Sequence, residues 1–305
     1  MISINAPDFV ENFNVAEMTV GIIGHGYVGQ AVEAFFSSVC RSYVYDKYDS
    51  KLDTLETVIK NSHVIFVCVP TPMNRDGSCH TGIVESVLDD IVATAERVER
   101  DVNEFVVVVK STVWPGFTDK MREQKKLRIV FSPEFLTEKN SIQDFENTNR
   151  LLLGGQDEDA LVIFKFFEKK LASRATIVQC DSSVAEMTKL FANAMLTVKV
   201  MFANEMYFVC KELGINYEEV KTLACLDRRI AHSHLSVPGH DGDFGYGGHC
   251  FPKDIGSLRS IAKRLNIGEK LFTACIERND EVRNHKDWED MKGRAVVEDY
   301  EKDNK

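Results

Sequence analysis

Short apolar runs alternate with amphipathic stretches through the first 180 residues. The expected strands are 18–23, 42–45, 63–69, 105–109, 127–131, 150–154 and 175–179. Apolar residues at helical spacing between them predict helices ending near Ser38 and over 53–60, 83–99, 117–125 and 157–170. Strand and helix in alternation predict an α/β fold with a doubly wound parallel sheet.

The pattern changes to helix alone after residue 180. Residues 182–213 contain no glycine or proline, Ser183 and Glu186 form a capping-box pair, and Gly214 is a stop signal. One long central helix of about 45 Å is therefore expected. Its wide apolar stripe is typical of a core helix, and its length and methionines also favour a subunit interface. The expected domains are 1–180, a helical domain over 181–285, and a charged tail over 286–305.

Composition narrows the class of protein. The net charge of -10 argues against a nucleic-acid binder, because phosphate backbones require clustered Lys and Arg. Neither a signal peptide nor a run of about 20 apolar residues is evident, so we expect a cytoplasmic protein without a membrane segment. The eight cysteines are scattered and read as free thiols. We expect no metal site, because His232, His234 and His240 lie close together but have no acidic or cysteine partner at zinc-like spacing.

A glycine-rich motif joins the first strand to the first helix. Gly24, Gly26 and Gly29 form G-x-G-x-x-G, and together with Tyr27 and Val28 they are expected to bind the cofactor. Such a turn lets a pyrophosphate approach the backbone at a helix N-terminus. Asp46, at the end of the second strand, is placed to bind the ribose of NAD and to repel NADP, a preference that Lys47 softens. The alternative is that Asp46 is only a turn residue. The motif predicts a Rossmann-type NAD-binding domain.

Three loops follow strands of the predicted sheet with hydroxyl, proline or acidic residues. They are Val69 to Pro72, Lys110 to Val113, and Ser132 to Glu138. Ligands of doubly wound sheets bind beyond the carboxyl ends of the strands. Each loop has an ordinary composition by itself, but together they indicate a binding site at one edge of the sheet.

The second half holds a candidate nucleophile in the stretch from Phe244 to Asp254. Two glycines precede Cys250, and Pro252 sits where a helix opens. The helix dipole and Lys253 favour the thiolate, and Asp254 follows one turn later. The alternative for any single cysteine is a small buried hydrophobe. The glycines, which permit close approach to a ligand, favour the nucleophile here.

Lys189 and Asn193 lie four residues apart on the long helix and so share one face. Beside an apolar stripe, such residues are more often solvent-facing than catalytic, and the pattern alone leaves both interpretations open.

These motifs, taken in order, resemble those of the UDP-glucose/GDP-mannose dehydrogenase family. The segments that carry the resemblance are 24–29, 68–72, 110–113, 132–138, 189–194, 204–205 and 247–254. The resemblance covers roughly residues 18–283 and implies oxidation of a nucleotide-sugar C6 alcohol to a carboxylate with two NAD. UDP-glucose is the expected substrate, and a UDP-N-acetylhexosamine or GDP-mannose is the alternative.

The resemblance also implies roles for individual residues. Cys250 would hold the thiohemiacetal and thioester, Lys189 and Asn193 would stabilise charge on the C6 oxygen, and Asp254 would act in base catalysis through water. Water for thioester hydrolysis would be activated by Glu134 or Glu138 with Thr112. Further cofactor contacts are expected from Pro70, Thr71, Thr112, Glu138 and Lys253. Further substrate contacts are expected from Phe135, Leu136, Phe244, Gly245, Tyr246 and Gly247.

The family further implies a homodimer joined by the long helix, with Arg229 reaching the neighbouring subunit's substrate. Members usually carry a third, Rossmann-like domain, and this sequence is expected to be a short form, in which those contacts come from the tail, come from a partner or are absent. Two alternatives remain. One is a simple hydroxyacid dehydrogenase, which would form one NADH per substrate. The other is an NAD-binding or regulatory subunit without turnover.

Overall fold

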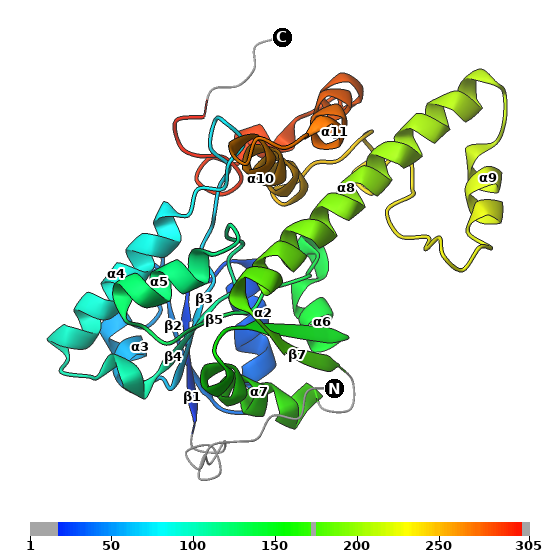
Figure 1. Ribbon diagram of the computed structural model, residues 1–305. Helices are drawn as coiled ribbons and strands as arrows, with labels where there is room; N and C mark the ends of the chain where they lie inside the picture. Colours follow the sequence, from blue (N-terminus) through cyan, green and yellow to red (C-terminus); the bar gives the residue numbers. More distant parts are fainter. Residues whose placement is uncertain (1–17, 172–174, 301–305) are drawn as a thin grey trace. The chain divides into compact units, whose positions relative to one another are not determined.

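The computed structural model describes residues 18–171 and 175–300 and divides into two compact units (Figure 1). The first unit comprises Met1–Thr71 and Thr81–Lys189 within those limits, and the second comprises Pro72–His80 and Leu190–Lys305. Helix α8 (Ser182–Glu212) runs from the first unit into the second. The boundary therefore falls inside the long helix rather than ahead of it, and a loop from the first half of the chain belongs to the second unit.

A seven-stranded sheet forms the centre of the first unit, with strand order β2-β1-β3-β4-β5-β6-β7. Its strands are β1 (Thr19–Ile23), β2 (Arg41–Tyr45), β3 (Val64–Val67), β4 (Val106–Val109), β5 (Ile129–Phe131), β6 (Arg150–Gly154) and β7 (Thr176–Cys180). Every strand was predicted from its apolar run, and the α/β architecture is confirmed.

The sheet is not parallel throughout. Strand β6 pairs antiparallel with β5 through Phe131 and Gly154, whereas the other neighbouring strands are parallel. The connection from β5 to β6 holds only short helices, and its helix α6 (Ser141–Glu146) packs against α2. The chain therefore re-enters the sheet in the opposite direction. Hydrophobic periodicity does not report strand direction, which is why the expectation of a fully parallel sheet is wrong at this junction.

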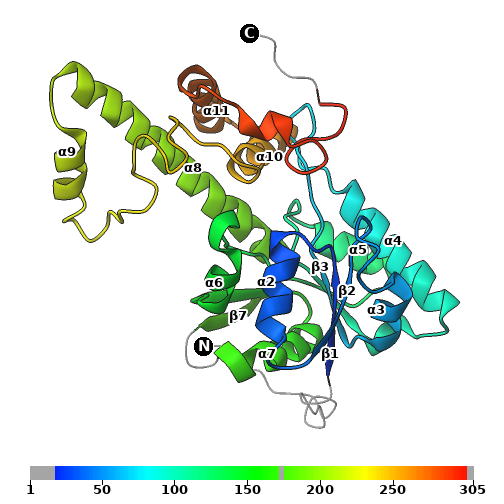
Figure 2. The same ribbon diagram turned by 180° about the vertical axis from the view of Figure 1, so that it is seen from behind.

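Helices cover both faces of this sheet. They are α2 (Tyr27–Phe36), α3 (Leu55–Asn61), α4 (Gly82–Arg97), η2 (Val102–Glu104), α5 (Phe117–Lys125), η3 (Glu138–Asn140), α6 and α7 (Asp157–Leu171). In β3, Val64 and Phe66 enter the core under α2 and α7, while Ile65 and Val67 enter the core under α3, α4 and α5. Figure 2 brings α2 to the front of the sheet. Successive strand residues point to opposite faces, so continuous apolar strands are buried on both sides.

The second unit is helical. Beyond α8 it contains α9 (Tyr217–Ala224), α10 (Phe251–Arg264), α11 (Lys270–Val282) and η4 (Asp287–Asp290). The opening of α10 beside Pro252 is confirmed, whereas α9 and α11 were not predicted. Gly214, with φ +69°, follows the end of α8 as the stop signal requires.

Residues 286–300, expected as a charged tail, are packed within the second unit. Trp288, Ala295 and Val296 are buried together with Met73 of the 72–80 loop. The Met73 N–H donates to the Ala295 carbonyl (2.8 Å), and the Val297 N–H donates to the Met73 carbonyl (3.1 Å). The few apolar residues of this segment therefore bury themselves against a loop far away in the sequence.

Across the described ranges, 18–171 and 175–300, no helix combines the length and the apolar character needed to cross a membrane. The same residues include no group of three or more His, Cys, Asp or Glu that could hold a metal ion.

Candidate active site

The glycine-rich turn of the first unit leaves room for a phosphate. A Cβ on Gly24 (φ +94°) would lie 2.7 Å from the Cys68 carbonyl oxygen, and one on Gly29 would lie 2.0 Å from the Gly24 carbonyl oxygen. Around Gly26, by contrast, nothing lies within 4 Å of such a Cβ, and no side chain caps the N-terminus of α2. The backbone at this helix start is therefore accessible to a pyrophosphate, as NAD requires.

Asp46 lies beside this turn. One carboxylate oxygen accepts the His25 N–H (2.7 Å), and the other accepts the Tyr48 N–H (2.9 Å). Lys47 next to it is exposed. The carboxylate thus lies next to the glycine motif, where an NAD ribose belongs, and it also fixes the turn between β2 and α3.

Lys189 and Glu134 form a buried pair in the first unit. The Lys189 Nζ donates to the Glu134 carbonyl (2.7 Å) and to its Oε1 (3.0 Å), and the Leu136 N–H donates to Oε2 (2.6 Å). Burial alone would raise the pKa of Glu134, but the Lys189 ammonium and these hydrogen bonds hold it below the ordinary value. The buried Lys189 ammonium is thereby held beside the ionised Glu134 carboxylate, which follows the C-terminal end of β5.

A second lysine lies in the same cluster. The Lys110 Nζ donates to the Ser132 Oγ and the Pro133 carbonyl, both at 3.3 Å. Burial lowers the pKa of Lys110 to about 8 and raises that of Cys68 to about 12. The sequence placed Lys110 in one of the loops of the expected binding site but gave this lysine no role of its own. Its only signal was a lysine directly after four consecutive valines.

The other predicted residues of this unit follow the ends of β3, β4 and β5. Thr71 and Thr112 are buried and Pro70 is exposed, while Phe135 and Leu136 are half-buried. The Phe135 ring centroid lies 4.1 Å from the Arg150 guanidinium carbon and 5.4 Å from the Lys189 Nζ. Glu138 is exposed at the start of η3.

The second unit places Cys250 and Asp254 on one turn of α10. Cys250 is the half-buried N-cap, and its carbonyl accepts the Asp254 N–H (2.9 Å). The Asp254 carboxylate accepts a hydrogen bond from the Asn193 amide (2.5 Å) and pairs with the Lys253 ammonium. Burial alone would lower the pKa of Lys253, but the Asp254 charge raises it above the ordinary value. Lys253, expected to bind cofactor, is buried in this ion pair.

Asparagines from two helices hold the glycine loop ahead of Cys250. The Gly245 N–H donates to Asn204 Oδ1 (3.0 Å). The Asn279 side chain accepts from the Tyr246 N–H (2.8 Å) and donates to its carbonyl (3.0 Å). Neither asparagine was predicted as a site residue. A polar residue on an otherwise apolar helical face is the signal that marks both.

Arg283 is the reason that position 247 of this loop requires a glycine. A Cβ on Gly247 would lie 2.0 Å from Arg283 Nη2. This buried guanidinium pairs with Asp241 (2.8 Å) and Asp287 (3.0 Å). The segment after α11 therefore braces the loop that precedes the cysteine.

Two expected substrate contacts lie in other surroundings. Phe244 packs against Tyr207 and Phe208, with ring centroids 5.6 and 5.2 Å away. The Arg229 side chain is 89% exposed and pairs with Asp227. The structure thus brings together Lys189 with Glu134 in one unit, and Cys250, Asp254 and Asn193 in the other. Lys189 and Asn193 lie one turn apart on α8.

Sequence comparisons match two domains of one family. The NAD binding domain of the UDP-glucose/GDP-mannose dehydrogenase family matches residues 43–171, and its central domain matches residues 183–281. Together they cover most of the chain. The cofactor predicted from the glycine motif, NAD, is the one that this first domain binds.

Curated relatives and a solved structure agree with this match. The UDP-glucose 6-dehydrogenase TuaD of Bacillus subtilis is 30% identical over 251 residues, which cover 79% of this chain and 51% of TuaD. A UDP-glucose 6-dehydrogenase of Rickettsia bellii is 27% identical, over 87% of this chain and 67% of its own. The chain thus spans half to two thirds of these relatives. In structure it is similar to a UDP-glucose dehydrogenase from Pyrobaculum islandicum, with a TM-score of 0.75, 24% identity, and coverage of 87% of this chain and 69% of that one. The chain belongs to the UDP-glucose/GDP-mannose dehydrogenase family and contains its NAD-binding and central domains.

Proposed function

We propose that this chain catalyses the NAD-dependent oxidation of a nucleotide-sugar C6 alcohol to a carboxylate, with UDP-glucose as substrate and UDP-glucuronate as product. The observation that carries the proposal is the group of Cys250, Asp254 and Asn193 around the first turn of α10. A thiol beside a buried carboxylate suits an oxidation that passes through a covalent sulfur intermediate. Family membership and the relatives' names support the substrate class.

The first oxidation needs a base and a stabilised oxygen. Bound NAD would accept one hydride in each of the two oxidations. We assign proton removal from the C6 hydroxyl to Asp254 acting through water, and stabilisation of the C6 oxygen to Lys189 and Asn193. A cation and an amide directed at a developing oxyanion lower the barrier by electrostatic stabilisation.

The second oxidation uses the cysteine. The Cys250 thiolate adds to the aldehyde carbon and gives a thiohemiacetal, whose hydride loss leaves a thioester. Water, activated by Glu134 or Glu138 with Thr112, then attacks the thioester carbonyl and releases the carboxylate and the thiol. Each sugar consumed therefore yields two NADH, and one water supplies the second carboxylate oxygen.

Counting NADH per sugar tests this proposal. UDP-glucose, UDP-N-acetylglucosamine and GDP-mannose are supplied separately, and two NADH per sugar consumed are expected with the true substrate. Cys250→Ser should lower the formation of sugar acid by roughly a thousandfold or more, because serine forms no thioester. Cys225→Ser, at the half-buried end of α9, is the matched control and should keep full activity.

Two outcomes contradict the proposal. One NADH per substrate with a small hydroxyacid would indicate the related hydroxyacid dehydrogenases. NAD binding without turnover of any nucleotide sugar would indicate a binding or regulatory subunit.

The proposed enzyme is a homodimer joined through α8. Large apolar side chains spaced three, four or seven residues apart are exposed on this helix: Val184, Met187, Phe191, Met195, Phe202 and Val209. Soluble monomers rarely leave so long an apolar face in water, and a second copy of the same face would bury it. Sedimentation should give a dimer for the native chain and a monomer for Phe202→Asp. A monomeric native chain would contradict the dimer.

A further inference from the structure

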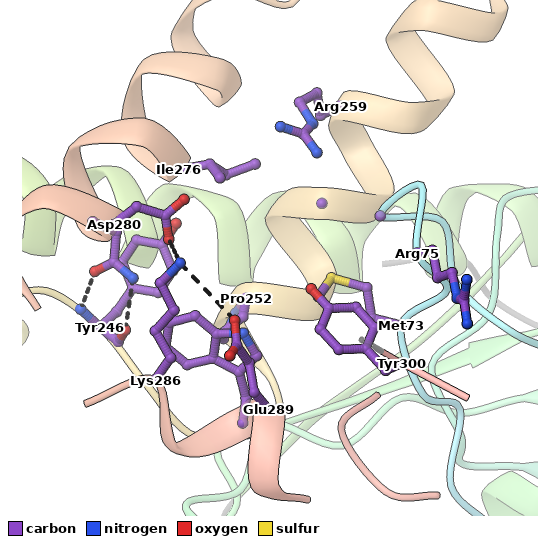
Figure 3. Close-up of a pocket in the computed structure, with 14 residues that line it drawn as sticks. Met73, Arg75, Tyr246, Pro252, Arg259, Ile276, Asp280, Lys286, Glu289 and Tyr300 are labelled. Atoms are coloured by element: carbon purple, nitrogen blue, oxygen red, sulfur yellow. Dashed lines mark hydrogen bonds and ion pairs between the residues drawn. The ribbon is translucent and has the colours of Figure 1, made fainter. Parts of the chain in front are cut away.

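A cavity of about 450 Å³ lies wholly within the second unit (Figure 3). Its walls come from α10, α11, the 72–80 loop and the segment 286–300. This volume is in the range of small-molecule sites. It is formed largely by the segment that the sequence led us to expect as a tail.

The cavity lies on the other side of α10 from Asp254 and its partner Asn193. Pro252, Gly256 and Arg259 line it and recur at helical spacing. Asp254, which bonds to Asn193, lies two residues after Pro252 and hence about 200° around the helix axis. A ligand in the cavity would therefore occupy a site separate from Asp254 and Asn193. Tyr246, which the family resemblance assigns to the substrate, lines this cavity.

One end of the cavity presents Arg259, for which the described residues provide no hydrogen-bond or ion-pair partner. The Arg259 Nε is buried, and no hydrogen bond or ion pair within the described residues includes this side chain. Figure 3 shows Arg259 and Ile276 at one end, with Glu289 and Tyr300 at the other. A buried donor left unsatisfied costs free energy, so an anion at this position would stabilise the protein.

The remaining charges in the cavity are already compensated. Lys286 pairs with Asp280 (2.8 Å) and lies 3.9 Å from Glu289. Arg75 donates to the Asp299 carbonyl (3.1 Å). Arg259 has a Coulombic attraction to Asp76 but forms no ion pair with it within the described residues, so its guanidinium remains available to a ligand. Its planar fork suits phosphate or carboxylate.

The walls between these ends are largely aromatic and apolar. Trp288 and Tyr246 are buried, and they line the cavity with Tyr300, Met73 and Ile276. Flat rings and a thioether favour contact with another ring. We propose that this cavity binds a small organic anion that carries a ring, with its phosphate or carboxylate group on Arg259 and its ring against Trp288 and Tyr300. The proposal is independent of the reaction proposed above.

Tryptophan fluorescence can report occupancy directly. The chain has two tryptophans, so in a Trp114→Phe background Trp288 is the sole reporter. Phenyl phosphate and benzoate are titrated as the two ring-bearing anions, with orthophosphate and phenol as their separate parts. A saturable change in Trp288 fluorescence is expected with phenyl phosphate or benzoate, and the tighter of the two identifies the head group. Orthophosphate and phenol should bind at least tenfold more weakly. No saturable change with either ring-bearing anion would overturn the proposal.

A pair of arginine variants locates the ligand. Arg259→Gln should weaken binding roughly tenfold or more, because a charge-assisted hydrogen bond is lost. Arg264→Gln makes the same change at an exposed position of the same helix and should bind as the native chain does. Ile276→Phe, which fills part of the cavity, should also weaken binding. Equal affinity in all three variants would overturn the proposal. NAD and nucleotide sugars are absent throughout, so the outcome does not depend on catalysis.

Discussion

Each unit contains a cluster of buried lysine and carboxylate side chains, but the two clusters differ in net charge. In the first unit, Glu134 faces both Lys189 and Lys110, so two cations share one carboxylate. In the second unit, Lys253 and Asp254 form a pair of one cation and one anion, to which Asn193 adds a neutral donor. At Lys110 the effect of burial exceeds that of the neighbouring charges, so its pKa falls. At Lys253 the effect of the neighbouring charges exceeds that of burial, so its pKa rises.

The difference indicates how each cluster is suited to its proposed role. An excess of buried positive charge destabilises the resting protein and is relieved when negative charge develops nearby, which suits the oxyanion role of Lys189. A balanced pair has no such excess and instead holds its side chains in place. We therefore expect the ion pair with Lys253 to hold Asp254, the proposed base, in place next to Cys250, and the cluster around Glu134 to be the electrostatically strained one.

The largest expected effect follows from removing the carboxylate that two lysines share. Glu134→Gln leaves Lys110 and Lys189 buried with no anion, and it should lower the free energy of unfolding of the first unit by about 3–5 kcal/mol. Urea denaturation followed by Trp114 fluorescence in a Trp288→Phe background measures it. Glu123→Gln, exposed on α5, is the control. A loss no greater than that of the control would refute the idea of a strained cluster.

The balanced pair should be less sensitive to the same kind of change. Asp254→Asn leaves only Lys253 uncompensated, and the new amide oxygen still accepts from Asn193. The expected loss is about 3 kcal/mol, smaller than that of Glu134→Gln. Trp288 fluorescence in a Trp114→Phe background reports on the second unit, with Glu277→Gln, exposed on α11, as control. A larger loss here than at Glu134 would reverse the comparison.

Alkaline pH should distinguish the clusters further. The pKa of Lys110 is about 8 in the folded protein, against an ordinary value of 10.5. Between these values the unfolded chain binds more protons, so the contribution of Lys110 makes the free energy of unfolding rise with pH, by up to about 3 kcal/mol. Lys110→Met should remove this rise between pH 8 and 10. Identical pH profiles for the two proteins would show that Lys110 does not titrate in this range.

The smallest effect is expected at an exposed ion pair. Asp227 and Arg229 pair on the surface of the second unit, where water screens their attraction. Asp227→Asn should leave the urea midpoint unchanged while Asp254→Asn in the same unit lowers it. A comparable shift for both would mean that burial does not govern the strength of these pairs.

Much of the first unit could be predicted from the sequence. Its strands carry continuous apolar residues because both faces are covered, and Gly24, Gly29 and Asp46 occupy positions set by local backbone geometry. The direction of β6 could not be predicted, since residue periodicity is the same for parallel and antiparallel strands. Helices α9 and α11 were also missed, although their apolar residues pack in the cores of the second unit.

The candidate site divides in the same way. Cys250 and Asp254 were singled out from their motif, whereas Lys189 and Asn193, which helical spacing left open, received roles only from the family resemblance. The hydrogen bond between Asn193 and Asp254 agrees with that grouping. The residues that support them were not identified. Lys110, Asn204, Asn279 and Arg283 form hydrogen bonds to atoms distant in the sequence, and the local pattern around each does not indicate those partners.

The sequence by itself determined the strands of the first unit, the glycine turn for NAD, and the cysteine at the start of a helix, because each depends on a short local stretch of chain. Only the tertiary structure decided that burial lowers the pKa of Lys110 and that Asn204 and Asn279 hold the glycine loop. It alone also showed that residues 286–300 enclose a cavity with Met73. The reason is physical. Burial and ion pairing depend on which distant segments come into contact, and the local sequence pattern does not determine those contacts.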